Sequence, residues 1–324
     1  MVLHNIIVFL FLYHLSRASA ANTCISSDSQ EEVRAVIRKS AESKQDGKKS
    51  RWAVVCLAKP EQVDIISRRN KALASKLLPF AKKHDITFIF FSELQFPSSV
   101  EKSFRKSLEE VGAVRFVDTS SRGFQQKERF GYKYMCKFFG LDMYDYLREF
   151  EYYMRCDTDC YMKRLDYDVL QWAEDHKLGY GYALRKLEAH GPTRQTLPMW
   201  TQKYLSRCNL KPTAVMDRPL SVCFNFYNNW HIGSVAFFNR PDVRHFLEAV
   251  NASGHILSDR WGDSTIQAYA VRLFMDIGQL LVVPNVTYVH GSHSVRVTSF
   301  SDETSEVPQT LPLFSSPRRP PRDR

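Results

Sequence analysis

Strand-like apolar runs and helical segments alternate along the chain from residue 51, and this alternation limits the possible fold more than any other feature of the sequence. Residues 51–58 and 86–91 are β-rich apolar runs, and residues 63–84 between them carry helical periodicity. A strand–helix–strand order is typical of parallel strands, because these need a long crossover connection. A helix at 100–111 and a strand at 113–117 continue the order. The sequence therefore predicts an α/β fold on a mainly parallel sheet.

The rest of the chain predicts further elements of the same kinds. An aromatic helix at 132–150 precedes an apolar strand that ends at Asp157. Later helices are expected at 169–176, 197–208, 241–250 and 264–275. Later strands are expected at 179–185, at 232–238 and, as the final strand, at 280–283. No internal repeat interrupts this order, so a single α/β domain is the simplest arrangement.

Two carboxylates, Asp157 and Asp159, follow the strand that ends near residue 156. Side chains two apart on a strand share a face, so both can reach one hard cation. Open α/β sheets bind ligands at the carboxyl ends of their strands. The sequence contains neither G-x-G-x-x-G nor a P-loop, so nucleotide phosphates would be held through a metal. An Asp-rich turn has the same appearance, and the motif alone leaves that interpretation open.

Further blocks give this motif a context: 132–138, the segment Cys223 to Gly233, the string Arg-Trp-Gly-Asp at 260–263, and Tyr-Val-His at 288–290. In this order the chain resembles the fungal Golgi α-1,2-mannosyltransferases of glycosyltransferase family 15, from about residue 51 to residue 290. The resemblance implies a single GT-A-like domain, with a central mixed, mainly parallel sheet flanked by helices. It also implies retaining transfer of mannose from GDP-mannose to a mannoside of a glycoprotein glycan, with Mn²⁺ as cofactor.

The resemblance also implies roles for single residues. The metal ligands that it implies are Asp157, Asp159 and His290. The residues that it places along the donor and acceptor cleft are Tyr132, Tyr134, Arg155 and Asn229, with Asp263 as a catalytic acid group. Two structural interpretations stay open beside these roles. Asp263 stands directly before a predicted helix and equally fits an N-cap, and His290 taken alone fits a hydrogen-bonded structural histidine.

His231 departs from the family pattern. In the family an Asn-Phe-Glu-Ile block supplies a carboxylate that is proposed as the nucleophile, whereas this chain reads Asn-Trp-His-Ile at 229–232. Histidine cannot form the same glycosyl ester. Two alternatives follow: front-face substitution with His231 at the catalytic centre, or a changed function. The changed function is either transfer of a different nucleotide sugar or non-catalytic binding of a glycan or nucleotide.

The charge pattern argues against a nucleic-acid partner. The net charge is +10, but the basic residues are spread along the chain instead of forming a stripe interleaved with aromatic residues. The seven cysteines lack the spacing of a zinc site, so buried or disulfide-linked thiols are expected.

The two ends of the chain predict a secretory protein. Residues 1–21 read as a signal peptide or signal-anchor: the short apolar run and its small-residue ending favour cleavage, and the family's topology favours an anchor. Residues 22–50 read as a stem or linker, 51–298 as the GT-A-like domain, and 299–324 as a disordered tail. The sequons at Asn251 and Asn285 agree with a Golgi lumenal location, with membrane association through the N-terminal segment.

Overall fold

The computed structural model describes residues 49–122, 131–212, 218–291 and 293–297. A seven-stranded sheet runs through these residues in the order β10-β6-β9-β4-β1-β2-β3. Its strands are β1 Arg51–Leu57, β2 Asp85–Ser92, β3 Ala113–Asp118, β4 Tyr152–Cys156, β6 Tyr180–Tyr182, β9 Trp230–Ser234 and β10 Leu280–Val282. All neighbours in this order are parallel except β9, which runs antiparallel to both β4 and β6. The predicted α/β fold with a mixed, mainly parallel sheet is confirmed.

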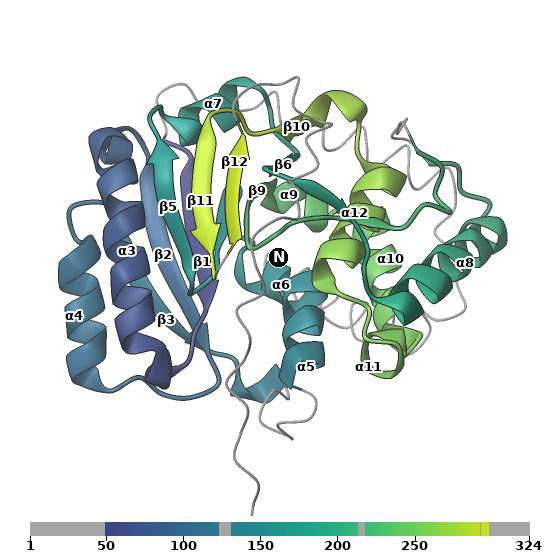
Figure 1. The fold of residues 1–324 in the computed structure, drawn as a ribbon, viewed down its shortest axis with the longest axis horizontal. Coiled ribbons are helices and arrows are strands. Elements are labelled where there is room, and N and C mark those ends of the chain that lie inside the picture. The colour runs from purple at the N-terminus through teal and green to yellow at the C-terminus, as the bar shows by residue number, and fades with distance from the viewer. Residues whose placement is uncertain (1–48, 123–130, 213–217, 292, 298–324) are drawn as a thin grey trace, which may run out of the picture.

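Helices cover both faces of this sheet because successive residues of its strands alternate between two apolar cores (Figure 1). In β1, Trp52 and Val54 face one core, and Ala53 and Val55 face the other. The first core contains α3 Val63–Leu77, α4 Ser98–Leu108 and α7 Val169–Asp175. The second contains α5 Gly131–Lys137, α6 Met143–Tyr146, α8 Gly191–Cys208, α9 Val235–Phe238, α10 Pro241–Ala252, α11 His255–Ser258 and α12 Asp263–Phe274.

Two smaller antiparallel sheets lie beside the main one, and the sequence did not predict them. One contains β5 Cys160–Leu165, β11 Val286–His290 and β12 His293–Val297 in the order β12-β11-β5. The other pairs β7 Arg185–Leu187 with β8 Phe224–Phe226. The expectation that 280–283 is the final strand was therefore wrong. The chain turns after β10 through the left-handed Asn285 and returns as β11.

Several predicted elements differ in detail from the structure. The helix expected at 197–208 begins earlier, at Gly191, and the strand expected at 179–185 is shorter, as β6. The strand expected at 232–238 ends at Ser234, whose hydroxyl accepts a hydrogen bond from the Phe237 N–H and starts α9. The helix expected at 132–150 is α5, a π-helical segment Phe138–Asp142 and α6. The helix expected at 63–84 ends as α3, and a 3-10 helix with a proline in its first turn, Leu78–Lys83, follows.

The predicted segments at 1–21 and 299–324, and nearly all of 22–50, lie outside the described residues, so the division into domains stays a prediction. Among the helices that the structure describes, none has the length and apolarity needed to cross a bilayer. Cys208 is disulfide-bonded. The free cysteines of the described residues are all buried, namely Cys56, Cys136, Cys156, Cys160 and Cys223.

Candidate active site

Arg155 is the centre of an ion-pair network at the carboxyl end of β4. Its side chain is 3% exposed, and its guanidinium lies 3.5 Å from the ring centre of Phe139. The Nε and Nη2 atoms donate to the two oxygens of Asp157 at 2.7 and 3.2 Å, and Nη1 donates to Asp263 Oδ2 at 2.5 Å. Burial lowers the pKa of Arg155, but the Asp157 and Asp263 carboxylates raise it by more. The guanidinium therefore stays charged and holds both carboxylates in place.

Asp263 opens α12, a helix of the second core, yet it is not the N-cap, the structural role that the sequence left open for it. The N-cap is Gly262, and no side chain caps the helix. The carboxylate instead accepts hydrogen bonds from Arg155 and from Asn228 Nδ2, the latter at 2.8 Å. Asn228 Nδ2 also donates to Gln267 Oε1 at 3.1 Å. The side chain of Asp263 is thus committed to the pocket and not to the helix end.

His290 and Asp159 form a second pair beside this network. The β11–β5 pairing aligns His290 with Cys160, and this register brings its Nε2 to 3.2 Å from Asp159 Oδ1. The other ring nitrogen of His290, Nδ1, lies 3.1 Å from the Tyr227 hydroxyl. Both ring nitrogens of His290 are therefore engaged by protein groups, and binding a metal through one of them requires that nitrogen to leave its present partner.

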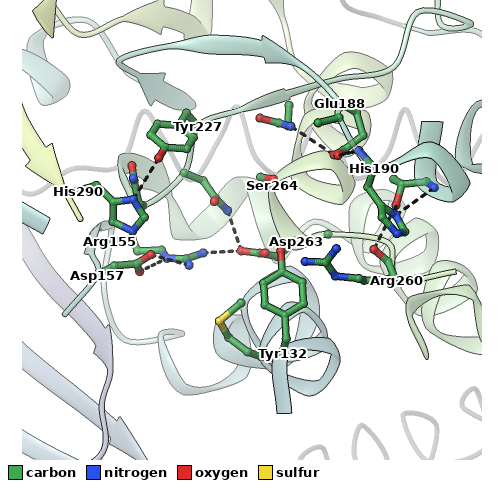
Figure 2. Close-up of a pocket in the computed structure, with 17 residues that line it drawn as sticks. Tyr132, Arg155, Asp157, Glu188, His190, Tyr227, Arg260, Asp263, Ser264 and His290 are labelled. Carbon is green, nitrogen blue, oxygen red and sulfur yellow. Dashed lines mark hydrogen bonds and ion pairs between the residues drawn. The ribbon is translucent and has the colours of Figure 1, made fainter. Parts of the chain in front are cut away.

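One cavity of about 670 Å³ is lined by the Arg155 network and by His290 of the second pair, but not by Asp159. Asp157 and His290 lie toward one side of it, Glu188 and His190 toward the other, and Asp263 between them (Figure 2). Its lining residues come from α5, the end of β4 and the residue after it, the β7–α8 connection, α8, β8, the segment before β9, both sides of the α12 start, and the end of β11. They are Tyr132, Met135, Arg155, Asp157, Glu188, Ala189, His190, Thr193, Asn225, Tyr227, Asn228, Asn229, Arg260, Gly262, Asp263, Ser264 and His290.

The predicted metal ligands fit a divalent cation only in part. Carboxylate and imidazole groups suit Mn²⁺. The side chains of Asp159 and His290 are 3.2 Å apart, close enough to share one cation. Both oxygens of Asp157, however, accept from Arg155, so the predicted role of Asp157 as a ligand requires its carboxylate to leave that partner. No cluster of three or more His, Cys, Asp or Glu side chains placed to hold a metal occurs within the described residues.

The structure brings most of the other predicted site residues into the cavity. Tyr132, half-exposed, lines it, and the Arg260 guanidinium lies 4.4 Å from the centre of its ring. Asn229 also lines it: Oδ1 accepts from the Tyr288 hydroxyl at 2.9 Å. The buried amide nitrogen of Asn229 makes no well-formed hydrogen bond within the described part of the chain, although the Asn229 side chain interacts with that of Tyr227.

Three predicted residues do not line the cavity: Asp159, Tyr134 and His231. Asp159 lies next to it, where it pairs with His290. Tyr134 is partly buried and packs against the second core, because residues two apart on a helix point in nearly opposite directions. His231 is fully buried in β9 beneath Arg155, its neighbour in the sheet. Its Nδ1 donates to the Asn228 carbonyl at 2.9 Å, and its Nε2 accepts from the Tyr153 hydroxyl at 3.1 Å.

Burial, together with the nearby Arg155 charge, lowers the pKa of His231 to about 3. The ring is therefore neutral, and both of its nitrogens are already hydrogen-bonded. The predicted place of His231 at the catalytic centre is not what this structure shows. Its side chain supports the wall behind Arg155 without reaching the cavity.

Sequence reasoning missed several residues that line the cavity: Glu188, His190, Asn225, Tyr227, Asn228 and Arg260. Three of these, Asn225, Tyr227 and Asn228, lie inside the block at 223–233, and Arg260 lies inside the Arg-Trp-Gly-Asp string. Neither block alone indicates which of its side chains face the cavity. No motif pointed to Glu188 or His190, which follow a strand that the sequence did not resolve.

Fold and site together define the class of the protein. A mixed α/β sheet with an acid-lined cavity at the end of β4 is the architecture of GT-A glycosyltransferases. The structure has the fold of core-mannan synthase A from Aspergillus fumigatus, solved in an Mn/GDP form, with a TM-score of 0.65, 19% identity, and coverage of 78% of this chain and 77% of that one. The mannosyltransferase Ktr4p of Saccharomyces cerevisiae also gives a TM-score of 0.65, with 16% identity and coverage of 92% and 90%.

The family follows from the sequence comparison. Residues 118–301, more than half of the chain, match the glycolipid 2-alpha-mannosyltransferase family, glycosyltransferase family 15, and the chain belongs to that family. Glycolipid 2-alpha-mannosyltransferase 1 of Candida albicans is 26% identical over 174 residues, which are 49% of this chain and 39% of that protein. The probable mannosyltransferase MNT3 of the same organism is 24% identical over 228 residues, 67% of this chain and 57% of that one. The matches thus span about half the length of these relatives.

Proposed function

We propose that this chain is a metal-dependent, retaining mannosyltransferase that moves mannose from GDP-mannose to a mannoside of a glycoprotein glycan. One observation carries the proposal. A single cavity brings the His290–Asp159 pair next to the Arg155 network that holds Asp157 and Asp263. The donor nucleotide and its mannose are taken from the family to which the chain belongs.

Asp159 and His290 would hold Mn²⁺, and Asp157 would join them where its carboxylate exchanges Arg155 for the metal. A divalent cation in this place neutralises the leaving diphosphate. Asn229 lines the same cavity, where its side-chain amide would contact a donor or acceptor oxygen. Tyr132 presents an aromatic face, which suits the CH surface of a sugar ring.

The burial of His231 favours front-face substitution over a double displacement. In this reaction the bond from the anomeric carbon to the acceptor oxygen forms on the face from which the phosphate oxygen departs. The acceptor proton moves to the departing diphosphate oxygen, so no enzymic nucleophile is needed, and the α configuration is retained. Asp263, fixed by Arg155 and Asn228, supplies negative charge where positive charge develops on the sugar.

The presence of His231 in place of the family's carboxylate favours a second candidate function. A family member without the nucleophilic carboxylate is also the expected form of a descendant that binds a glycan or nucleotide without transferring sugar. A third possibility keeps the chemistry and changes the nucleotide sugar.

We place the protein in the secretory pathway, in the Golgi lumen. Two features support this location: Cys208 is disulfide-bonded, and both sequon asparagines, Asn251 and Asn285, are exposed. Association with the membrane through residues 1–21 is part of the same proposal.

A donor screen tests the proposal most directly. The full chain is incubated with Mn²⁺, methyl α-mannoside and a panel of nucleotide sugars, and nucleotide release and the anomeric configuration of the product are measured. We expect transfer from GDP-mannose with an α product. Turnover of another donor alone would show the third possibility. Binding of GDP without turnover of any donor in the panel would show a binding descendant.

A further inference from the structure

Two buried cysteines flank the turn that carries Asp157 and Asp159. Cys156 is the last residue of β4, Cys160 is the first residue of β5, and the side chains of both are shielded from solvent. Both are free thiols in this structure, and both belong to the first core. The proposed transfer reaction uses neither of them.

The turn brings these two thiols together. The Cys160 N–H donates to the Asp157 carbonyl at 3.1 Å, which closes a β-turn over residues 157–160. The chain therefore turns sharply between the two cysteines. The Cys156 Sγ donates to the Cys160 carbonyl at 3.5 Å, and the two thiols are also hydrogen-bonded to each other. Side chains that already face each other in this way meet a main geometric requirement for a disulfide.

Cys56, in the neighbouring strand β1, is another thiol close to Cys156. Its side chain has different partners, because it is hydrogen-bonded to Arg69 and its Sγ lies 3.8 Å from the Leu57 carbonyl oxygen. Cys160 is therefore the better placed partner for Cys156.

The proposed secretory location supplies the oxidising conditions that a disulfide needs, and Cys208 of this chain is disulfide-bonded. Because Cys156 and Cys160 are buried in the folded chain, their oxidation belongs to the folding process. One thiolate attacks the disulfide of an oxidant, a protein disulfide or oxidised glutathione, and forms a mixed disulfide. The other cysteine then displaces the remaining sulfur of the oxidant. Two electrons and two protons pass to the oxidant, which leaves as two thiols.

We propose that Cys156 and Cys160 form a disulfide that bridges the turn 157–159 and holds its two carboxylates beside the metal site. Cys156 pairs with Trp230 in the main sheet, and Cys160 pairs with His290 in the small sheet. The bridge therefore joins the two sheets where the proposed metal ligands lie. A turn that is fixed in advance does not have to be ordered by the cation, which lowers the entropic cost of binding. This effect on the metal rests on the proposed function, whereas the bond itself does not.

Peptide mapping of the secreted full chain tests the bond. Trypsin cleaves after Arg155 and Lys163, so peptide 156–163 contains both cysteines of the pair and no other cysteine. The protein is denatured without reductant in the presence of an alkylating reagent and is then digested. We expect peptide 156–163 to be two hydrogen atoms lighter than its dithiol form and to take up alkyl groups only after reduction. Cys136, buried and free in peptide 134–137, is the control and should be alkylated without reduction.

Either of two results in this map overturns the inference. One is alkylation of both cysteines of peptide 156–163 without reduction. The other is a cross-link between peptide 156–163 and the peptide that contains Cys56.

Cys160→Ala tests the effect on the metal site, with Cys56→Ala as the matched control, since Cys56 is a buried thiol of the same core outside the bridge. Calorimetric titration measures the affinity for GDP with and without Mn²⁺. We expect Cys160→Ala to weaken the Mn²⁺-dependent affinity about fivefold and Cys56→Ala to leave it unchanged. Cys156→Ala should cause the same loss as Cys160→Ala, because neither thiol can form the bond alone.

Thermal unfolding of each variant separates this effect from a loss of structure. Equal Mn²⁺-dependent affinities in the wild type and in the folded bridge variants overturn the proposed role of the bridge at the metal site. Failure of the proposed function has a different sign, because the wild type itself then shows no Mn²⁺-dependent GDP binding. The peptide map needs no ligand and decides the bond in either case.

Discussion

Among single residues, Arg155 supplies the positive charge that pairs with the carboxylates of Asp157 and Asp263. Two carboxylates depend on it, and its own side chain is almost fully buried. Removing one partner of a buried ion pair leaves an uncompensated charge, which typically costs about 3–5 kcal/mol. We therefore expect Arg155→Ala to lower the free energy of unfolding by an amount in that range, as measured by urea denaturation.

Arg164→Ala is the control for this prediction. Arg164 pairs with Asp166 at 2.6 Å, but both side chains are more than half exposed, so its loss should cost less than about 1 kcal/mol. Equal stabilities of the two variants would mean that the Arg155 network does not stabilise the folded chain.

The metal site gives a second prediction. Asp159→Ala and His290→Ala should each lower the Mn²⁺-dependent affinity for GDP more than about tenfold, because each removes a proposed ligand. Asp157→Ala should lower this affinity as well, because it removes the third proposed ligand, a carboxylate that Arg155 holds beside the proposed metal site. Calorimetric titration of GDP with and without Mn²⁺ measures this. Asp166→Ala, on the exposed surface, is the control, and unchanged metal dependence in Asp157→Ala and Asp159→Ala would reduce the motif to a turn.

His231 gives a prediction about pH. Its pKa is about 3 in the folded chain and near the ordinary 6.5 in the unfolded chain, so the unfolded chain binds more protons below pH 6.5. The stability that the neutral ring contributes is present above pH 6.5 and is lost as the pH falls toward 3. Between pH 7 and pH 5 the wild type should lose about 2 kcal/mol more than His231→Gln, by urea denaturation at both pH values. The exposed His176, replaced in His176→Gln, should show no such difference.

Sequence motifs identified those site residues whose side chains have a distinctive chemistry. Arg155, Asp157, Asp263 and His290 were all identified from the sequence, and all line one cavity. Glu188 was not, because its place depends on a short strand pair and on donors contributed by segments far along the chain. Such a position has no local signature.

At the scale of elements, α5 places on different faces two tyrosines that the sequence analysis assigned to the same cleft. Tyr132 faces the cavity, and Tyr134 faces the core. Tyr132→Ala should therefore weaken mannoside or donor binding with a small change in stability. Tyr134→Ala should lower the free energy of unfolding by about 2–4 kcal/mol, because it removes a large side chain that packs on the core. Each variant is the control for the other, in parallel ligand titrations and denaturation experiments. If Tyr134→Ala weakened binding and Tyr132→Ala destabilised the fold, the assignment of Tyr132 to the cavity and Tyr134 to the core would be wrong.

Element types were predictable where length and periodicity agree. The strands β1, β2 and β3 and the helices α4, α10 and α12 lie close to their predicted ranges. The pairs β7–β8 and β11–β12 were missed because short strands leave few alternating positions to recognise. The boundary between β9 and α9 was also missed, since it depends on one hydroxyl, that of Ser234, within a continuous apolar run.

At the scale of the whole molecule, the order of the elements in sequence was enough to predict the class of fold, because a crossover helix between strands permits few arrangements. The sequence did not predict that β9 enters the sheet in the opposite direction. The direction of β9 is set by the long connection from β6, which includes α8. The sequence of that connection gives no local sign of the strand direction.

The secretory route is the prediction at this scale. We expect the mature protein to begin near Ala21 or Asn22 and to carry a glycan on Asn251, Asn285 or both. Intact mass before and after glycosidase treatment measures both properties, with Asn251→Gln and Asn285→Gln to assign the sites. An unmodified product with every thiol free would contradict the route.

The antiparallel strand β9 has a consequence for biosynthesis. It lies between β4 and β6, which both precede it in the chain, and its His231 contacts Tyr153 across 78 residues. A nascent chain that ends before residue 234 therefore lacks the strand that joins β6 and β10 to the rest of the sheet. Contacts between residues so distant in sequence form slowly, since the chain entropy of closing the loop is lost first. The wall behind Arg155 therefore cannot be completed before β9 has been synthesised, although Arg155 itself lies in the earlier strand β4.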